Sequence, residues 1–247
     1  MTRLSNQVAV VTGASSGIGK AIALGLAEQG ATLCLVGRKL ETLRAVADKA
    51  PTTGGRVLSY QTDLTQDEDI RMLAANLERD VGFVDILIHS AGFIELGRLE
   101  GAWIGNFDRH YRTNVRAPYA LTQALLPMLR KRRGQIVFIN STTGLKARAN
   151  VGQYAATKHA LKAVADSLRE EVNSDVRVLS VFLGQTATPM QAALHEAEGR
   201  EYHAEKLMQP DDVASVVISA LTLPRTAEVT EISMRPLAPP RSDVRVP

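Results

Sequence analysis

The stretch TGASSGIG, residues 12–19, decides how this chain folds. It follows the short apolar run 8–11 and opens the helical pattern of residues 17–29. Glycines at such a point let the backbone approach a pyrophosphate closely, and the free N–H groups and dipole of the next helix favour negative charge. We therefore expect a strand, a phosphate-binding turn and a helix, in that order.

Two other motifs overlap this stretch, and the first is the P-loop. A P-loop needs a glycine, four further residues and then Gly-Lys-Ser/Thr. If Gly19 and Lys20 supply the last glycine and the lysine, Ala14 stands where the first glycine belongs. Ala21 then stands where the hydroxyl residue belongs, so the sequence does not support a P-loop.

The second overlapping motif is the G-x-S-x-G nucleophile elbow of hydrolases, which residues 13–17 match around Ser15. Such an elbow normally caps a strand in mid-sheet, whereas residues 12–19 follow the first predicted strand. The later histidines, at positions 159, 195 and 203, follow no evident strand end. A serine hydrolase remains an alternative, as does a glycine turn that serves only to pack a helix against a strand.

Short β-branched runs alternate with longer segments of helical apolar spacing along the chain. The predicted strands are 8–11, 32–36, 56–61, 84–88, 135–140, 176–183 and 229–233. The predicted helices are 17–29, 40–49, 66–80, 107–132 and 152–173, with one or two more within 189–223. Near-continuous apolar strands such as VDILI and QIVFI indicate a parallel sheet covered on both faces. The fold class is therefore α/β, with an open, doubly wound parallel sheet of about seven strands and helices on both faces.

No linker rich in Gly, Ser or Pro divides the 247 residues, so we predict a single domain over residues 1–235. The segment 236–247 holds four prolines and little pattern. We expect this C-terminal tail to run over the surface or onto a neighbouring subunit.

The composition, with 45% hydrophobic and 22% charged residues, is that of a globular protein with a real core. A net charge of +3 is too small to indicate a polyanionic partner, and 4% aromatic residues argue against nucleic-acid binding. The single cysteine, Cys34, lies in an apolar run and is expected to be a buried hydrophobe. The scattered histidines predict no metal site. The chain shows no signal segment and no apolar stretch of about 18 residues, so we expect a cytoplasmic protein with no membrane partner.

Tyr154 and Lys158 are spaced i and i+4 on one predicted helix, so an ammonium can lie beside a phenol. A nearby positive charge favours phenolate, so we expect it to lower the pKa of the tyrosine and make it a usable acid/base. Ser141 ends the strand QIVFIN, at the edge of the sheet where ligands bind in open α/β folds. Its hydroxyl can hydrogen-bond a carbonyl or alkoxide oxygen as the charge there changes.

Several motifs in order support one family. The glycines follow G-x-x-x-G-x-G, Tyr154 and Lys158 form Y-x-x-x-K, and Ser141 precedes Tyr154. Asn114 stands in FDRHYRTN, and Asp63 opens DLT after the third predicted strand. Over nearly its whole length, the chain therefore resembles the classical short-chain dehydrogenase/reductase family, which has a Rossmann-like fold.

The resemblance implies an oxidoreductase that moves a hydride between a nicotinamide cofactor and a small carbonyl/secondary-alcohol pair. It implies that Tyr154 protonates the carbonyl oxygen, Ser141 orients it, Lys158 holds the nicotinamide ribose and Asn114 anchors a proton-relay water. It also implies a homodimer or homotetramer. A dinucleotide-binding sensor or scaffold that has lost catalysis is the alternative, and the intact Ser141, Tyr154 and Lys158 argue against it.

The second predicted strand ends Val36-Gly37-Arg38, without the carboxylate that would bond the adenosine 2′-hydroxyl in an NAD site. Arg38 can instead meet a 2′-phosphate, so we expect NADP(H) to be favoured over NAD(H). The residues expected to bind the cofactor are Gly13, Ser15, Ser16, Gly17, Ile18, Gly19, Arg38, Asp63, Leu64, Ser90, Ala91, Gly92, Tyr154, Lys158, Gly184, Thr186 and Thr188.

The sequence departs from the family pattern at two points near the cofactor. His89 replaces the first asparagine of the usual Asn-Asn-Ala-Gly, and Leu183 replaces proline in the usual Pro-Gly. We expect substrate specificity to come from residues 93–105 and from a mobile lid over residues 184–208. Phe93, Ile94, Leu96 and Trp103 suggest a partly apolar pocket, although any of them could instead belong to the core.

Overall fold

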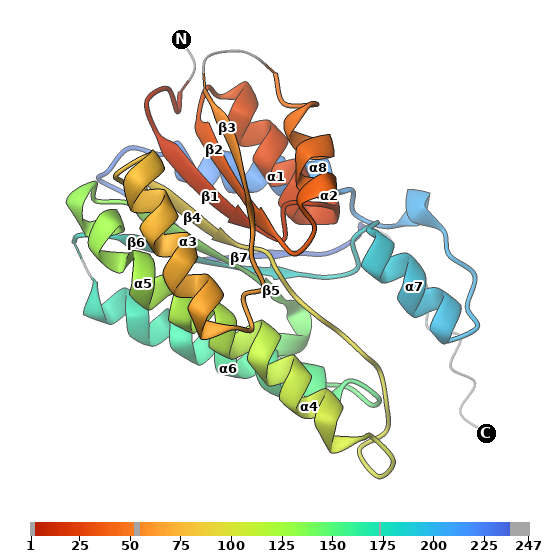
Figure 1. Ribbon diagram of the computed structural model, residues 1–247. Helices are drawn as coiled ribbons and strands as arrows, with labels where there is room; N and C mark the ends of the chain where they lie inside the picture. The colour runs from red at the N-terminus through yellow and green to blue at the C-terminus, as the bar shows by residue number, and fades with distance from the viewer. Residues whose placement is uncertain (1–2, 52–54, 173, 238–247) are drawn as a thin grey trace.

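A computed structural model describes residues 3–51, 55–172 and 174–237. Its strands form one parallel sheet in the order β3-β2-β1-β4-β5-β6-β7, which confirms the predicted fold class (Figure 1). The strands are β1 Val8–Thr12, β2 Thr32–Gly37, β3 Val57–Gln61, β4 Ile86–His89, β5 Gln135–Ser141, β6 Arg177–Leu183 and β7 Glu231–Met234. The helices are α1 Gly17–Glu28, α2 Leu40–Ala47, α3 Asp67–Asp80, α4 Ile104–Tyr111, α5 Ala117–Lys131, α6 Gly152–Glu171, α7 Pro189–Ala197 and α8 Pro210–Leu221.

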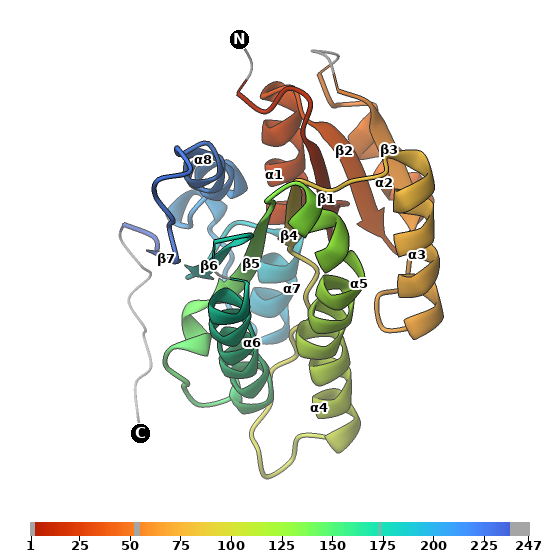
Figure 2. The ribbon, with the colours of Figure 1, turned by 90° about the vertical axis from the view of Figure 1, so that its left-hand side faces the viewer.

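The sheet is the middle of three layers. Helices α1, α2 and α8 share one buried cluster with the sheet, and α3, α5 and α6 share the other (Figure 2). The strand order reverses between β1 and β4, because the first three strands are added toward one edge and the remaining four toward the other. At such a reversal the connections on the two sides leave a crevice at the carboxyl ends of the strands, where ligands bind in open α/β sheets.

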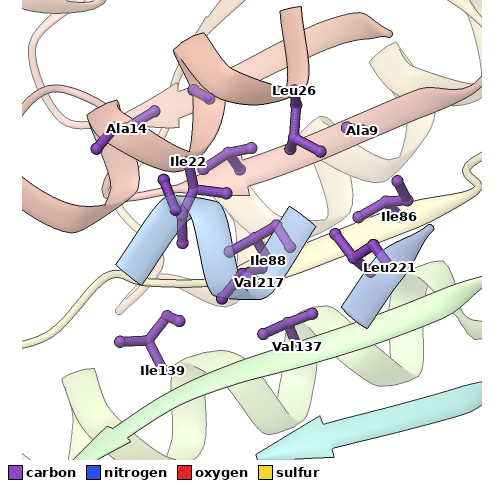
Figure 3. Packing of buried hydrophobic residues seen from close by; sticks show 14 of the residues in the cluster. Ala9, Ala14, Ile22, Leu26, Ile86, Ile88, Val137, Ile139, Val217 and Leu221 are labelled. Carbon is purple, nitrogen blue, oxygen red and sulfur yellow. The ribbon is translucent and has the colours of Figure 1, made fainter. Parts of the chain in front are cut away.

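Successive side chains along a strand point to opposite faces of the sheet, so the hydrophobic core consists of two clusters, one on each face. In β1, Ala9 contacts the α1 and α8 layer, whereas Val10 contacts the α3 and α5 layer. Figure 3 shows the first layer, where Ile22, Val217 and Ile88 from three different elements pack together. Each of these three side chains is completely buried, and burial of an aliphatic side chain stabilises a fold by about 1.5–3 kcal/mol. This packing fixes the strand ends from which the candidate site is built.

One predicted helix is wrong in its form. The expected helix over residues 107–132 is divided into α4 and α5 by a π-helical turn, Arg112–Arg116. The Ala117 N–H bonds the Arg112 carbonyl five residues back. Pro118 supplies the reason, because it has no N–H to offer the Asn114 carbonyl four residues earlier and its ring would clash there. The wider turn leaves Asn114 at the bend.

Two helices and the C-terminal tail follow β6, with β7 between them. The region 189–223 contains two helices, α7 and α8, joined through residues 198–209. Most of the predicted tail, residues 238–247, lies outside the described residues, so its course and the domain boundary at 235 remain predictions. Among the described helices, none has the length and apolarity needed to cross a lipid bilayer.

Candidate active site

The glycine turn between β1 and α1 is shaped by close backbone contacts. Gly13 has a φ of +64°, and a Cβ built on it would lie 2.9 Å from the Cα of Ala91. A Cβ on Gly19 would lie 2.5 Å from the Gly13 carbonyl oxygen. Gly17, with a φ of +52°, faces the Thr188 side chain, whose Cγ2 would lie 3.1 Å from an added Cβ. Only glycine fits these contacts, so the turn forms a concave backbone surface at the carboxyl end of β1.

The amino end of α1 opens toward this turn. Ser16 occupies the N-cap, and its side chain makes no capping hydrogen bond. The first N–H groups of the helix thus remain available to an anion. Beside them, the Thr12 hydroxyl accepts the N–H groups of Ser90 and Ala91 at 3.0 and 3.1 Å, which ties β1 to the loop after β4. These features fit a bound pyrophosphate.

We expect Gly13→Ala to weaken dinucleotide binding and to lower the free energy of unfolding by about 1–2 kcal/mol. The positive φ strains any L side chain, and the new methyl group would press on the Ala91 backbone. Denaturant unfolding and a dinucleotide titration measure both effects. Gly101→Ala is the control, because a Cβ there has open space around it. If the two variants behave alike, the close approach does not matter.

Ser141, Tyr154 and Lys158 lie together at the carboxyl ends of β5 and β6. Ser141 ends β5, and its hydroxyl accepts the Thr143 N–H at 3.2 Å. The Asn140 side chain joins the strand to α6, since its Oδ1 accepts the Ser141 N–H at 2.8 Å and its Nδ2 donates to the Lys158 carbonyl at 3.1 Å. Sequence reasoning missed Asn140, although its place beside Ser141 at a strand end was a signal.

The pKa values differ from the expectation. Desolvation raises the pKa of the Tyr154 phenol to about 12, and a hydrogen bond with Ser141 acts in the opposite direction. Lys158 does not offset the desolvation, because its ammonium donates to the Ile139 carbonyl at 3.1 Å and lies 5.7 Å from the centroid of the tyrosine ring. Desolvation lowers the pKa of Lys158 itself to about 8. At neutral pH the phenol therefore holds its proton and can donate it.

Asn114 does not line the cavity that contains Tyr154. Its side-chain amide is bonded to the loop that follows β4, because Oδ1 accepts the Phe93 N–H and Nδ2 donates to the Phe93 carbonyl, both at 2.8 Å. Nδ2 also donates to Thr157 at 3.2 Å. The side chain thus holds the loop at Phe93, and a role with a relay water remains a prediction.

His110 is a residue that the sequence analysis missed. It is fully buried, and burial lowers its pKa. Its Nδ1 lies 2.7 Å from the Asn106 carbonyl oxygen, and its Nε2 accepts the Glu95 N–H at 3.0 Å. The ring edge packs on Tyr154 at a centroid distance of 6.2 Å. His110 and Asn114 both bond the backbone of the loop after β4. Their i, i+4 spacing, which places them on one face of a helix, could have indicated this in the sequence.

The structure shows the surroundings of the two residues that depart from the family pattern. His89 is buried, stacks on Phe138 at 4.8 Å and lies 2.8 Å from the Thr122 hydroxyl on α5. Desolvation lowers its pKa to about 3, so it is a neutral hydrogen-bonding residue of the core. Leu183 is buried against the α8 layer, and the following Gly184 N–H bonds the Met234 carbonyl of β7 at 2.8 Å.

A cavity of about 580 Å³ joins these features into one site. It runs along the glycine turn, past the exposed Arg38 at the end of β2 and Asp63 after β3, to Ser141, Tyr154 and Lys158. Of the residues predicted from the sequence to act in catalysis or to bind the cofactor, only Gly17 and Asn114 do not line it. Those that do are Gly13, Ser15, Ser16, Ile18, Gly19, Arg38, Asp63, Leu64, Ser90, Ala91, Gly92, Ser141, Tyr154, Lys158, Gly184, Thr186 and Thr188.

The structure corrects one pocket residue and bears on two other interpretations. Phe93, Ile94 and Leu96 line the cavity, but Trp103 is 71% exposed on the surface at the start of α4. No histidine of the described chain lines the cavity beside Ser15, which leaves a hydrolase elbow without a base. The described residues include no group of three or more His, Cys, Asp or Glu side chains placed to hold a metal ion.

Comparison with known proteins gives the family. A family model for short chain dehydrogenases matches residues 7–199, so the chain belongs to the short-chain dehydrogenase family. An oxidoreductase of Staphylococcus aureus (strain USA300) is 34% identical over 239 residues, which make up 96% of this chain and 100% of that protein. The protein is therefore an oxidoreductase of this family.

Two solved structures are similar over almost the whole chain. A short-chain dehydrogenase of Escherichia coli CFT073 complexed with NADPH has a TM-score of 0.87 and 31% identity, with 94% of this chain and 98% of that chain covered. An alcohol dehydrogenase of the archaeon Thermococcus sibiricus complexed with 5-hydroxy-NADP has a TM-score of 0.86 and 28% identity, with 94% and 97% covered.

Proposed function

We propose that this protein is an NADP(H)-dependent reductase of small carbonyl compounds, with Tyr154 as the general acid. One observation carries the proposal: Ser141, Tyr154 and Lys158 line the same cavity as an uncapped helix end and a glycine turn that admits no side chain. A catalytically silent dinucleotide sensor would need no such set of proton-transfer groups beside its nucleotide site.

The residues present fit a phosphorylated dinucleotide. The turn and the amino end of α1 fit the pyrophosphate, and the exposed Arg38 lies where a 2′-phosphate would reach it. No hydrogen bond or ion pair joins Arg38 to another residue in the ranges that the structure covers. Solved relatives complexed with NADPH and 5-hydroxy-NADP support the same choice. When bound, the nicotinamide supplies the hydride.

The chain's own residues would handle the proton. In the direction of reduction, the Tyr154 hydroxyl donates its proton to the carbonyl oxygen as negative charge develops there. A phenol with a pKa of about 12 is still far more acidic than the alcohol product. Proton transfer from Tyr154 to the developing alkoxide is therefore thermodynamically favourable. Ser141 donates a hydrogen bond to the same oxygen, and Lys158 holds the nicotinamide ribose. Asn114 and His110 act as positioning residues for the loop beside Tyr154.

We expect Arg38→Ala to raise the KM for NADPH by about tenfold or more and to leave the KM for NADH nearly unchanged, because only NADPH carries the 2′-phosphate. Steady-state kinetics with both cofactors measures the effect. Lys39→Ala, the neighbouring cation outside the cavity lining, is the matched control. Equal changes for the two cofactors would refute the phosphate contact.

The proposed function as a whole is tested by NADPH oxidation with a panel of small ketones, aldehydes and quinones. We expect turnover with members of this panel. If NADPH binds and no member is reduced, the silent-sensor alternative replaces the reductase.

A further inference from the structure

The cavity that contains Tyr154 is lined by several positively charged side chains besides those predicted to bind the cofactor. Arg109 on α4, Arg148 in the loop after β5 and Arg200 after α7 all line it. Arg200 forms an ion pair with Glu198, which also lines the cavity. Arg109 and Arg148 form no ion pair with any residue that the structure describes. Two of the cations that line the cavity, Arg109 and Arg148, therefore have no ion-pair partner among the described residues.

The Arg109 side chain stacks on an aromatic ring. Its guanidinium carbon lies 3.9 Å from the centroid of the Phe93 ring. Stacking of this kind orients the planar group and leaves its N–H edge free to bond an anion. The Phe93 backbone is in turn fixed by two hydrogen bonds with Asn114, each of 2.8 Å. Because the stacked group is already ordered, an anion bound there loses less to conformational entropy.

The same loop is tied to the catalytic tyrosine. Glu95, two residues after Phe93, donates its N–H to the buried His110, which is adjacent to Arg109 in α4. The His110 ring packs edge-on against Tyr154. These contacts link the Phe93 loop, on which Arg109 stacks, to the ring of Tyr154. A substrate with its carbonyl at Tyr154 can place a second group at this arginine.

Apolar side chains also line this cavity, among them Ile94, Leu96, Met190 and Leu194. We propose that the substrates are oxo-carboxylic acids, in which an apolar chain separates the reduced carbonyl from a carboxylate bound by Arg109 and Arg148. The inference rests on the proposed carbonyl reduction and adds its substrate class. Guanidinium groups bond carboxylates through paired N–H···O contacts, and a cationic cleft raises the local concentration of an anionic substrate.

The test compares oxo acids with their own methyl esters. A series of methyl ketones that end in a carboxylate at increasing chain length is assayed with NADPH, and each acid is matched by its ester. We expect kcat/KM for the best acid to exceed that of its ester by about tenfold or more. Added salt should reduce this acid-to-ester ratio, because it screens the exposed arginines. A ratio near one at every chain length overturns the inference.

Variants locate the effect. In Arg109→Gln and Arg148→Gln, and most strongly in the double variant, we expect the acid-to-ester ratio to fall toward one. Arg44→Gln, on the exposed side of α2 and outside the cavity, should keep the wild-type ratio. A ratio that persists in the double variant contradicts the assignment.

The failure of this inference is distinguishable from failure of the proposed function. If esters and neutral ketones are reduced with the same kcat/KM as the acids, the protein is still a reductase, but the proposed anion site is wrong. If nothing is reduced, the reductase fails, and isothermal titration calorimetry with the same acids and esters decides the site. Acid binding that is lost in the double variant supports it, and absence of acid binding overturns it.

Discussion

Tyr154→Phe is expected to lower kcat for carbonyl reduction by about a thousandfold, because a positioned general acid typically contributes 10²–10⁴-fold and phenylalanine has no proton to give. The ring remains, so its edge contact with His110 should persist and the fold should be retained. Cofactor affinity should change little, since the glycine turn and Arg38 are untouched. Single-turnover reduction and an NADPH titration measure the two quantities separately.

The pKa of Tyr154 sets a further expectation for the wild-type enzyme. With a pKa of about 12, the phenol is protonated at neutral pH, ready for reduction. Alcohol oxidation needs the deprotonated form, so its rate should rise with pH across the range above 7, whereas reduction should not. Tyr154→Phe should abolish this rise. Activity that survives the substitution, or oxidation that is independent of pH, would contradict the assignment of Tyr154 as the acid/base.

The elements that carry strong local patterns were predictable from the sequence. The β1 strand, the glycine turn and α1 follow from an apolar run, three glycines and a helical repeat, and their positions depend little on the rest of the chain. The family-like spacing of Ser141 and Tyr154 predicted that they lie close together. The Asn140 amide that joins β5 to α6 and so holds them there is seen only in the structure.

Other features depend on tertiary packing, which a linear pattern does not contain. The amphipathic repeat of residues 107–132 continues through the π turn, so periodicity alone could not locate it. Trp103 looked like a pocket residue because it is large and apolar, yet it lies outside at a helix start. The predicted direction of the Tyr154 pKa shift was wrong. The spacing of residues in the sequence indicates the neighbouring charge of Lys158, but not the desolvation that raises the pKa.

Desolvation also affects Lys158, because burial of its charge lowers the stability of the folded protein. Lys158 is 5% exposed, and its pKa falls from 10.5 to about 8. Below pH 8 both the folded and the unfolded chain carry the charge, and burying it costs roughly 3 kcal/mol of folding free energy. Between pH 8 and 10.5 only the unfolded chain binds the proton, so stability rises with pH until the penalty is gone.

Lys158→Met should therefore lower reductase activity by about a hundredfold or more and, at pH 7, raise the free energy of unfolding by about 2 kcal/mol, since the lost bond to the Ile139 carbonyl offsets part of the gain. The gain should disappear near pH 10.5. Urea unfolding at both pH values measures it. Lys162→Met, one turn further along α6, is the control: ion pairs with Asp166 and Glu231 raise the pKa of Lys162, so its loss should not stabilise the fold. A Lys158→Met variant that is less stable than the wild type at pH 7 would contradict this prediction. It would show that the Lys158 ammonium stabilises the fold, rather than lowering its stability for the sake of catalysis.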